Sequence, residues 1–147
     1  MESKMFSQPV GKRELRRALL CAIPLGAIAW ASEAFAGSYL DRAALIVAHA
    51  RKEADFLRNH LSDKDLADYV HEQADSRLSS ARSMQVPKQV ADAHPHLLMM
   101  LEHYERATHA ATQGDNAEFF KKQLEAREEE RIFRGVLKQL GWDLPSI

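Results

Sequence analysis

The chain has 147 residues, a nearly even balance of 20 Lys/Arg against 21 Asp/Glu, and one cysteine, Cys21. A single cysteine excludes an intrachain disulfide framework, thiolate-rich zinc sites, iron–sulfur clusters and haem attached through a Cys-x-x-Cys-His motif. The even charge, with no basic stripe on any segment, gives no electrostatic reason to bind nucleic acid.

The N-terminal segment has the three parts of an export signal. A basic stretch ends at Arg16 and Arg17, an uncharged run follows over residues 18–32, and the sequence Ala34-Phe35-Ala36 then matches the small-x-small pattern that signal peptidase accepts. The apolar run is about 15 residues, short of the 18 or more expected of a membrane-spanning helix. The segment therefore predicts export rather than a transmembrane anchor.

Cleavage at this pattern would fall between Ala36 and Gly37. We therefore predict a signal peptide at residues 1–36 and a mature domain at residues 37–147, which is periplasmic or secreted. The signal carries five of the 20 basic and three of the 21 acidic residues, so the mature domain has 15 against 18, a formal charge of −3. With Cys21 removed, the mature domain has no cysteine and depends on packing alone.

The signal leaves two questions open: the export route and whether the segment is cleaved. Arg16-Arg17 followed by Ala18-Leu19-Leu20 matches the twin-arginine pattern, a route that carries folded proteins, but Leu15 stands where a polar residue usually precedes the pair. The general secretory route therefore also fits. An uncleaved segment would instead tether the domain to a membrane, as an accessory subunit of an envelope complex.

Four segments after the signal show the apolar spacing of helices, and none shows the alternation of a strand. The first spans about residues 38–61, with apolar positions at intervals of three and four. Ser62 is the predicted N-cap of the second, about residues 63–84, which carries only a thin apolar stripe. We expect this second helix to be the least stable.

Prolines set off a short separate segment at residues 87–93 before the third helix, about residues 95–113. Gly114 is a natural helix stop, and Asp115 is the predicted N-cap of a fourth helix that runs to about residue 140. Short connections of this kind predict an all-α, antiparallel up-down-up-down four-helix bundle. We expect the C-terminal tail to fold over an open end of the bundle.

The third helix holds the densest group of candidate metal ligands: His96, Met99, Met100 and His103. Spacings of three, four and seven can place all four on one side of a helix. Imidazole and thioether together favour copper, and Met100 or His103 could also serve as an axial ligand of a non-covalent haem. The competing interpretation, which we favour, assigns the methionines to the core and the histidines to the surface, with no cofactor.

A second polar group combines His49, Glu53 and His60, spaced four and seven apart on the first helix. Glu130, on the fourth helix, falls on the buried side of its heptad pattern. A buried carboxylate is costly unless it is paired, so Glu130 is predicted to meet a cation or a histidine, or to lie at the rim, with Arg127 and Arg131 near enough to pair with it locally.

The sequence contains no hydrolase motif, no phosphate-binding loop and no Glu-x-x-His pair of the kind that di-iron bundles require. The favoured prediction is a non-enzymatic, exported binding or interaction module for an unidentified protein partner or small ligand of the cell envelope. It binds no nucleic acid, and it contacts a membrane only if the signal is uncleaved. The alternatives are a periplasmic copper or haem binder and the tethered accessory subunit.

Overall fold

The computed structural model describes the backbone of residues 26–147 and the side chains from residue 34 onward. The chain divides into two compact units, Met1–Ala31 and Ser32–Ile147. Of the first unit, only residues 26–31 are described, and they begin helix α1 (Gly26–Arg58). The predicted arginine pair, Cys21 and the first part of the apolar run lie outside the described residues.

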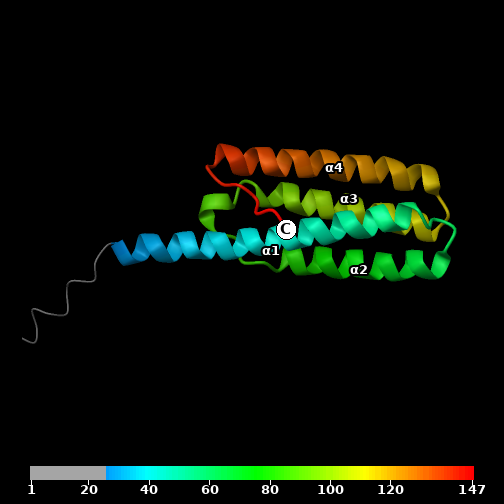
Figure 1. The fold of residues 1–147 in the computed structure, drawn as a ribbon, viewed down its shortest axis with the longest axis horizontal. Helices are drawn as coiled ribbons and strands as arrows, with labels where there is room; N and C mark the ends of the chain where they lie inside the picture. The colour runs from blue at the N-terminus through cyan, green and yellow to red at the C-terminus, as the bar shows by residue number, and fades with distance from the viewer. Residues whose placement is uncertain (1–25) are drawn as a thin grey trace, which may run out of the picture. The chain divides into compact units, whose positions relative to one another are not determined.

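The second unit is built from α-helices and, within its described residues, contains no strand (Figure 1). After α1 come α2 (Lys64–Arg82), a short 3₁₀ helix (Lys88–Val90), α3 (His94–Thr112) and α4 (Asn116–Gln139). The predicted helical class and the four-helix bundle architecture are confirmed at this level. The separate segment between the second and third helices is also confirmed.

Charged contacts between helices show how they are paired. His96 and His103 of α3 contact Glu129 and Glu125 of α4, so residue numbers rise along one helix as they fall along the other. Contacts of the same kind join the other neighbouring helices: Arg77–Glu53 between α2 and α1, Arg82–Glu102 between α2 and α3, and Arg51–Glu130 between α1 and α4. Each helix is therefore tied to two neighbours by charge as well as by packing.

Apolar side chains from all four helices form the core. The larger cluster gathers residues such as Val47, Leu97 and Phe133, and a smaller cluster toward the other end contains Leu57 and Phe119. Leu57 and Phe133 are completely buried, as the heptad spacing predicts. Full burial of such a side chain stabilises the fold by roughly 1.5–3 kcal/mol relative to exposure.

Helix ends follow local chemistry, with one correction. The carboxylate of Asp115 accepts a hydrogen bond from the Glu118 amide at 3.0 Å, which confirms the predicted N-cap of α4. At α2 the prediction was wrong by one residue, because Asp63 rather than Ser62 accepts from the Leu66 amide at 3.0 Å. An ionised carboxylate is a stronger acceptor at the positive end of a helix than a hydroxyl.

The predicted start of the first helix, near residue 38, was also wrong. Helix α1 begins at Gly26 and continues without a break through Ala36 and Gly37. The stretch is rich in alanine and contains no proline, so nothing in its local chemistry ends the helix at the predicted cleavage point. Ala36 is completely buried.

The C-terminal tail runs back toward α1, with its end marked over α1 in the view of Figure 1. Gly141 has a φ of +84°, and the Trp142 amide donates to the Leu137 carbonyl at 2.9 Å, the reversal of a Schellman-type helix end. Trp142 and Leu144 then pack against the larger core cluster. The tail thus packs on the core just beyond the end of α4, and its last residues continue beside α1.

No helix within residues 26–147 has the length and apolar character to cross a membrane.

Candidate functional site

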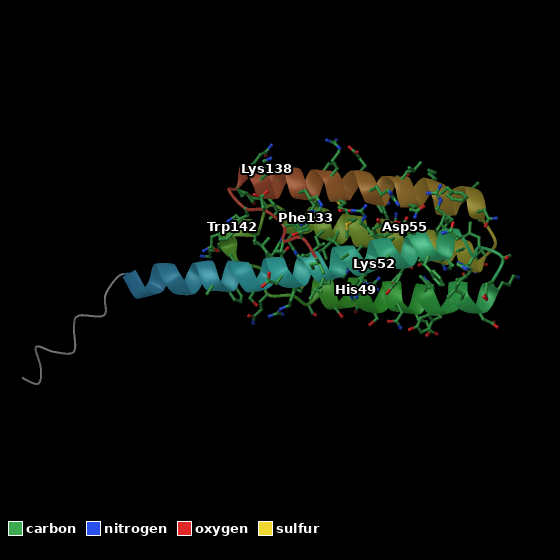
Figure 2. The ribbon with its side chains drawn as sticks, in the orientation of Figure 1. His49, Lys52, Asp55, Phe133, Lys138 and Trp142 are labelled. Atoms are coloured by element: carbon green, nitrogen blue, oxygen red, sulfur yellow. The ribbon has the colours of Figure 1, made fainter. Side chains whose placement is uncertain are left out.

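A groove of about 420 Å³ lies between α1, α4 and the C-terminal tail. Its lining combines small apolar residues of α1, charged residues of α1 and α4, and the tail: Ala44, Val47, Ala48, Arg51, Lys52, Asp55, Arg134 and residues 144–147. Lys52 and Asp55 are labelled on α1 in Figure 2, with His49 one turn earlier. The groove offers an apolar floor beside a charged rim.

Glu130 of α4 organises the charged rim. Its side chain is only 7 % exposed, and Oε1 accepts from Nε of Arg134 at 2.9 Å and from Nη1 of Arg51 at 3.4 Å. Both arginine side chains are nearly half exposed and line the groove. The prediction that Glu130 meets a cation is therefore confirmed.

The cations that pair with Glu130 are not Arg127 and Arg131, the two named from the sequence. Arg131 bonds Glu128 on the outer face of α4, and Arg127 crosses to Asp55 of α1. Arg131 follows Glu130 directly, and adjacent residues on a helix do not share a face, whereas Arg134 lies four residues on and does. Arg51 comes from another helix altogether.

Asp55 forms the second half of the network. Its Oδ1 accepts from Arg127 and from Nε2 of Gln123, which is 3.2 Å away and comes from the buried side of α4. The side-chain amide of Gln123 is buried, and Asp55 gives it a hydrogen-bond partner that it would otherwise lack. These contacts hold Asp55 at the edge of the groove.

The hydroxyl of Tyr104, on α3, lies in the electrostatic field of this network. Tyr104 is 2 % exposed, and among the described residues its hydroxyl has no hydrogen-bond partner. Burial raises the pKa of its phenol to about 12, and the charge of Glu130 adds to that shift while Arg127 opposes it. A buried hydroxyl without a partner costs stability, so its presence points to a role other than packing.

Counted over side chains, the groove and the adjoining network carry a local excess of positive charge. Arg51, Lys52, Arg127 and Arg134 bring four cations to them, while Asp55 and Glu130 bring two carboxylates, although the whole chain has a formal charge of −1. The helical pattern of the sequence indicated Glu130. It did not indicate Tyr104, Arg51 or Asp55, which become notable only through contacts between helices.

The candidate ligands on α3 separate in the structure. Met100 is completely buried in the larger core cluster, while Met99 is 41 % exposed. His96 and His103 both face α4, where Nδ1 of His96 lies 3.0 Å from Oε2 of Glu129 and Nδ1 of His103 lies 3.1 Å from Oε2 of Glu125. The structure therefore brings each histidine to a carboxylate and does not bring the two methionines together.

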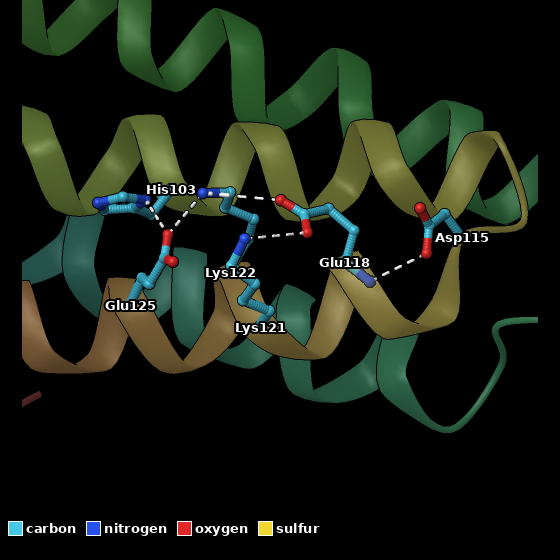
Figure 3. A network of polar contacts seen from close by, with 6 residues as sticks. All are labelled: His103, Asp115, Glu118, Lys121, Lys122 and Glu125. Carbon is cyan, nitrogen blue, oxygen red and sulfur yellow. Dashed lines mark hydrogen bonds and ion pairs between the residues drawn. The ribbon is translucent and has the colours of Figure 1, made fainter.

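Figure 3 shows the surroundings of His103. Its Nδ1 lies at ion-pair distance from Glu125, but the direction is not that of a hydrogen bond. Lys122 donates to the same Glu125 oxygen at 2.7 Å, and this hydrogen bond lowers the pKa of the Glu125 carboxyl. Across the part of the chain that the structure describes, no three His, Cys, Asp or Glu side chains converge as metal ligands.

The polar group predicted on the first helix is also dispersed. Glu53 pairs with Arg77 of α2 at 2.6 Å, and Nδ1 of His60 lies 2.8 Å from the Phe56 carbonyl of its own helix. His49 is exposed. Glu130, by contrast, contacts α1 through Arg51 and so belongs to the groove rather than to this group.

Comparison with known proteins found no match to a family model, to a curated protein or to a solved structure. The importance of the groove residues therefore rests on their geometry in this chain.

Proposed function

We propose that residues 37–147 form an exported, non-enzymatic binding module of up-down-up-down topology, and that the groove between α1, α4 and the C-terminal tail is its ligand site. One observation carries the proposal. Arg51 and Arg134 come from two different helices, share the buried carboxylate of Glu130, and line the same groove. Charged groups held in place beside an apolar floor are typical of ligand sites.

The buried polar network also supports the proposal, because burying polar groups costs free energy that a purely structural core would avoid. Tyr104, Gln123 and Glu130 all occupy buried positions. Apolar residues of similar shape there would be neutral or stabilising. Polar groups retained at such a cost are more often found at functional sites.

Binding is a better account of the groove than catalysis. Among its described lining residues there is no histidine or cysteine to act as base or nucleophile at neutral pH. Asp55, which supplies the side-chain carboxylate of the lining, is engaged by Arg127 and Gln123. The groove therefore offers fixed charges and apolar contacts, which recognise a ligand without transforming it.

Chemical-shift mapping of a small-molecule fragment library on the full-length chain tests the proposal. Hits should shift groove resonances such as those of Ala48 and Lys52, and Ala48→Trp, which fills the groove, should abolish their binding. The matched control is Ala117→Trp, at an exposed position on α4 that does not line the groove. Hits that map elsewhere, or that still bind to Ala48→Trp, would show that the groove is not the ligand site.

One observation favours the tethered accessory subunit as a second candidate. Ala36, the residue before the predicted cleavage point, lies within α1 and is completely buried. A helical, buried peptide bond must first unfold locally before a protease can hold it in extended form. If the domain folds before the peptidase acts, residues 1–36 stay attached, and N-terminal sequencing of the exported protein distinguishes the two forms.

A further inference from the structure

We infer that the ligand of the groove is a small amphipathic anion, a single carboxylate or phosphate group attached to a short apolar chain. This inference rests on the proposed function and assigns a chemical class to the same groove. Three properties of the lining lead to it: free cationic donors, an apolar floor of small side chains, and no side-chain carboxylate free to receive a cation.

The cationic donors come first. Glu130 engages one nitrogen of Arg51, Nη1, and one of Arg134, Nε. A guanidinium has five N–H donors, so each arginine keeps donors for a second anion, and both side chains are nearly half exposed. Two guanidinium groups beside one groove suit the planar, bidentate recognition of a carboxylate or the several oxygens of a phosphate.

Lys52 adds a further cation on the same rim. Within the described residues it forms no ion pair, whereas Lys121 and Lys122 on α4 each pair with a glutamate. Its ammonium can therefore approach a bound anion without first leaving a partner.

The apolar part of the ligand follows from the floor. Ala44, Val47 and Ala48 of α1 line the groove together with Leu144 and Ile147 of the tail. The small α1 side chains leave width for an alkyl chain, and about 420 Å³ is near the lower end of the size range of small-molecule sites. A short chain fits this space, whereas a large cofactor does not.

A cationic ligand finds no free side-chain carboxylate here. The groove's own carboxylate, Asp55, already accepts from Arg127 and Gln123, and the buried carboxylate behind it, Glu130, is held by two arginines. A cation would also meet the local excess of positive charge. The side chains of the groove therefore favour an anion over a cation.

Four probes of equal chain length test the inference on the full-length chain: octanoate, octyl phosphate, octanol and octyltrimethylammonium. Chemical shifts of the groove residues are followed during titration below the micellar concentration. The two anions should bind at least about tenfold more tightly than octanol, since a charge-assisted hydrogen bond contributes at least that factor. Octyltrimethylammonium should not shift the groove residues.

Variants identify the groups responsible. Arg51→Gln with Glu130→Gln removes a cation and its buried partner together, which avoids leaving a buried charge unpaired, and should reduce the preference for octanoate over octanol, with Arg134 and Lys52 still on the rim. Arg51→Lys should restore part of the preference for the anion. Arg131→Gln is the control, because Arg131 bonds Glu128 outside the groove and its loss should change nothing.

The outcomes separate the two proposals. Octanol binding in the groove as tightly as octanoate would overturn the anionic class while leaving the groove as a binding site. If none of the four probes nor any library compound shifts groove residues, the proposed function itself fails. Anionic lipid vesicles that shift these residues when monomeric octyl phosphate does not would also overturn the inference, because the ligand would then be a membrane surface.

Discussion

The hydroxyl of Tyr39, on α1, lies 2.9 Å from Nδ1 of His94, the first residue of α3. The two rings also meet edge to face, with their centroids 5.8 Å apart. Burial raises the pKa of the Tyr39 phenol and lowers the pKa of the His94 imidazole, so both groups are neutral near pH 7. In that state the phenol donates to the imidazole, and a proton on Nδ1 would remove the acceptor.

The free energy of unfolding should therefore fall on acidification, because protonation of His94 removes the acceptor of this hydrogen bond. The pKa of His94 is lower in the folded state than the value of about 6.5 expected for unfolded chains. As the pH falls below about 6.5, the unfolded state binds the proton first, and the free energy of unfolding decreases. Urea denaturation at pH 7, 6 and 5 should show a smaller loss for His94→Asn than for the natural chain, because the other histidines are common to both. Equal losses would show that His94 does not carry this effect.

Tyr104→Phe should leave stability unchanged or raise it by about 1 kcal/mol, because the hydroxyl it removes is buried without a described partner. Tyr39→Phe is the matched comparison. It removes the bond to His94 and should lower stability by about 1 kcal/mol. Denaturant midpoints of the two variants provide the measurement. A clear loss for Tyr104→Phe would mean that its hydroxyl is already hydrogen-bonded in solution.

Glu130→Gln should cost roughly 1–3 kcal/mol, since it weakens two charge-assisted hydrogen bonds to a buried acceptor. The cost stays below that of a fully buried ion pair, because Arg51 and Arg134 are nearly half exposed and can turn to water. Glu128→Gln, at an exposed position two residues earlier on α4, is the control and should have a smaller effect. Equal effects of the two changes would argue against an organising role for Glu130.

Export should yield a protein that begins at Gly37, and Ala36→Leu should cause precursor to accumulate, because signal peptidase needs a small residue there. N-terminal sequencing and immunoblotting of cell fractions are the measurements. Replacing both Arg16 and Arg17 by lysine should stop export only if the twin-arginine route is used. Recovery of exported protein that still begins at Met1 would favour the tethered form.

Adding copper tests the interpretation that the histidines and methionines of α3 bind no metal. Met100 lies in the core and Met99 toward solvent, so Cu(I) should not raise the melting temperature, and Met100→Ala should cost packing energy alone. Thermal unfolding with and without Cu(I) or Zn²⁺ measures this. Micromolar or tighter copper binding that disappears in the double variant His96→Ala, His103→Ala would instead establish the metal-binding alternative.

The sequence by itself determined the helical class and most of the helix ends. The apolar spacing that buries Leu57 and Phe133, the cap at Asp115 and the stop at Gly114 all depend on residues within a turn or two of one another. Such local preferences act before any tertiary contact forms, so they can be read from a single chain. The start of α1 was mispredicted because an export signal and a helix share the same apolar, alanine-rich chemistry.

Only the tertiary structure decided the candidate site. The heptad pattern showed that Glu130 is buried, but one of its partners, Arg51, stands 79 positions away on another helix. Whether the Tyr104 hydroxyl finds a partner, and whether His96 meets a methionine or Glu129, likewise depends on the rotation of each helix about its own axis. That rotation is set by the packing of the whole core, and no short stretch of sequence contains it.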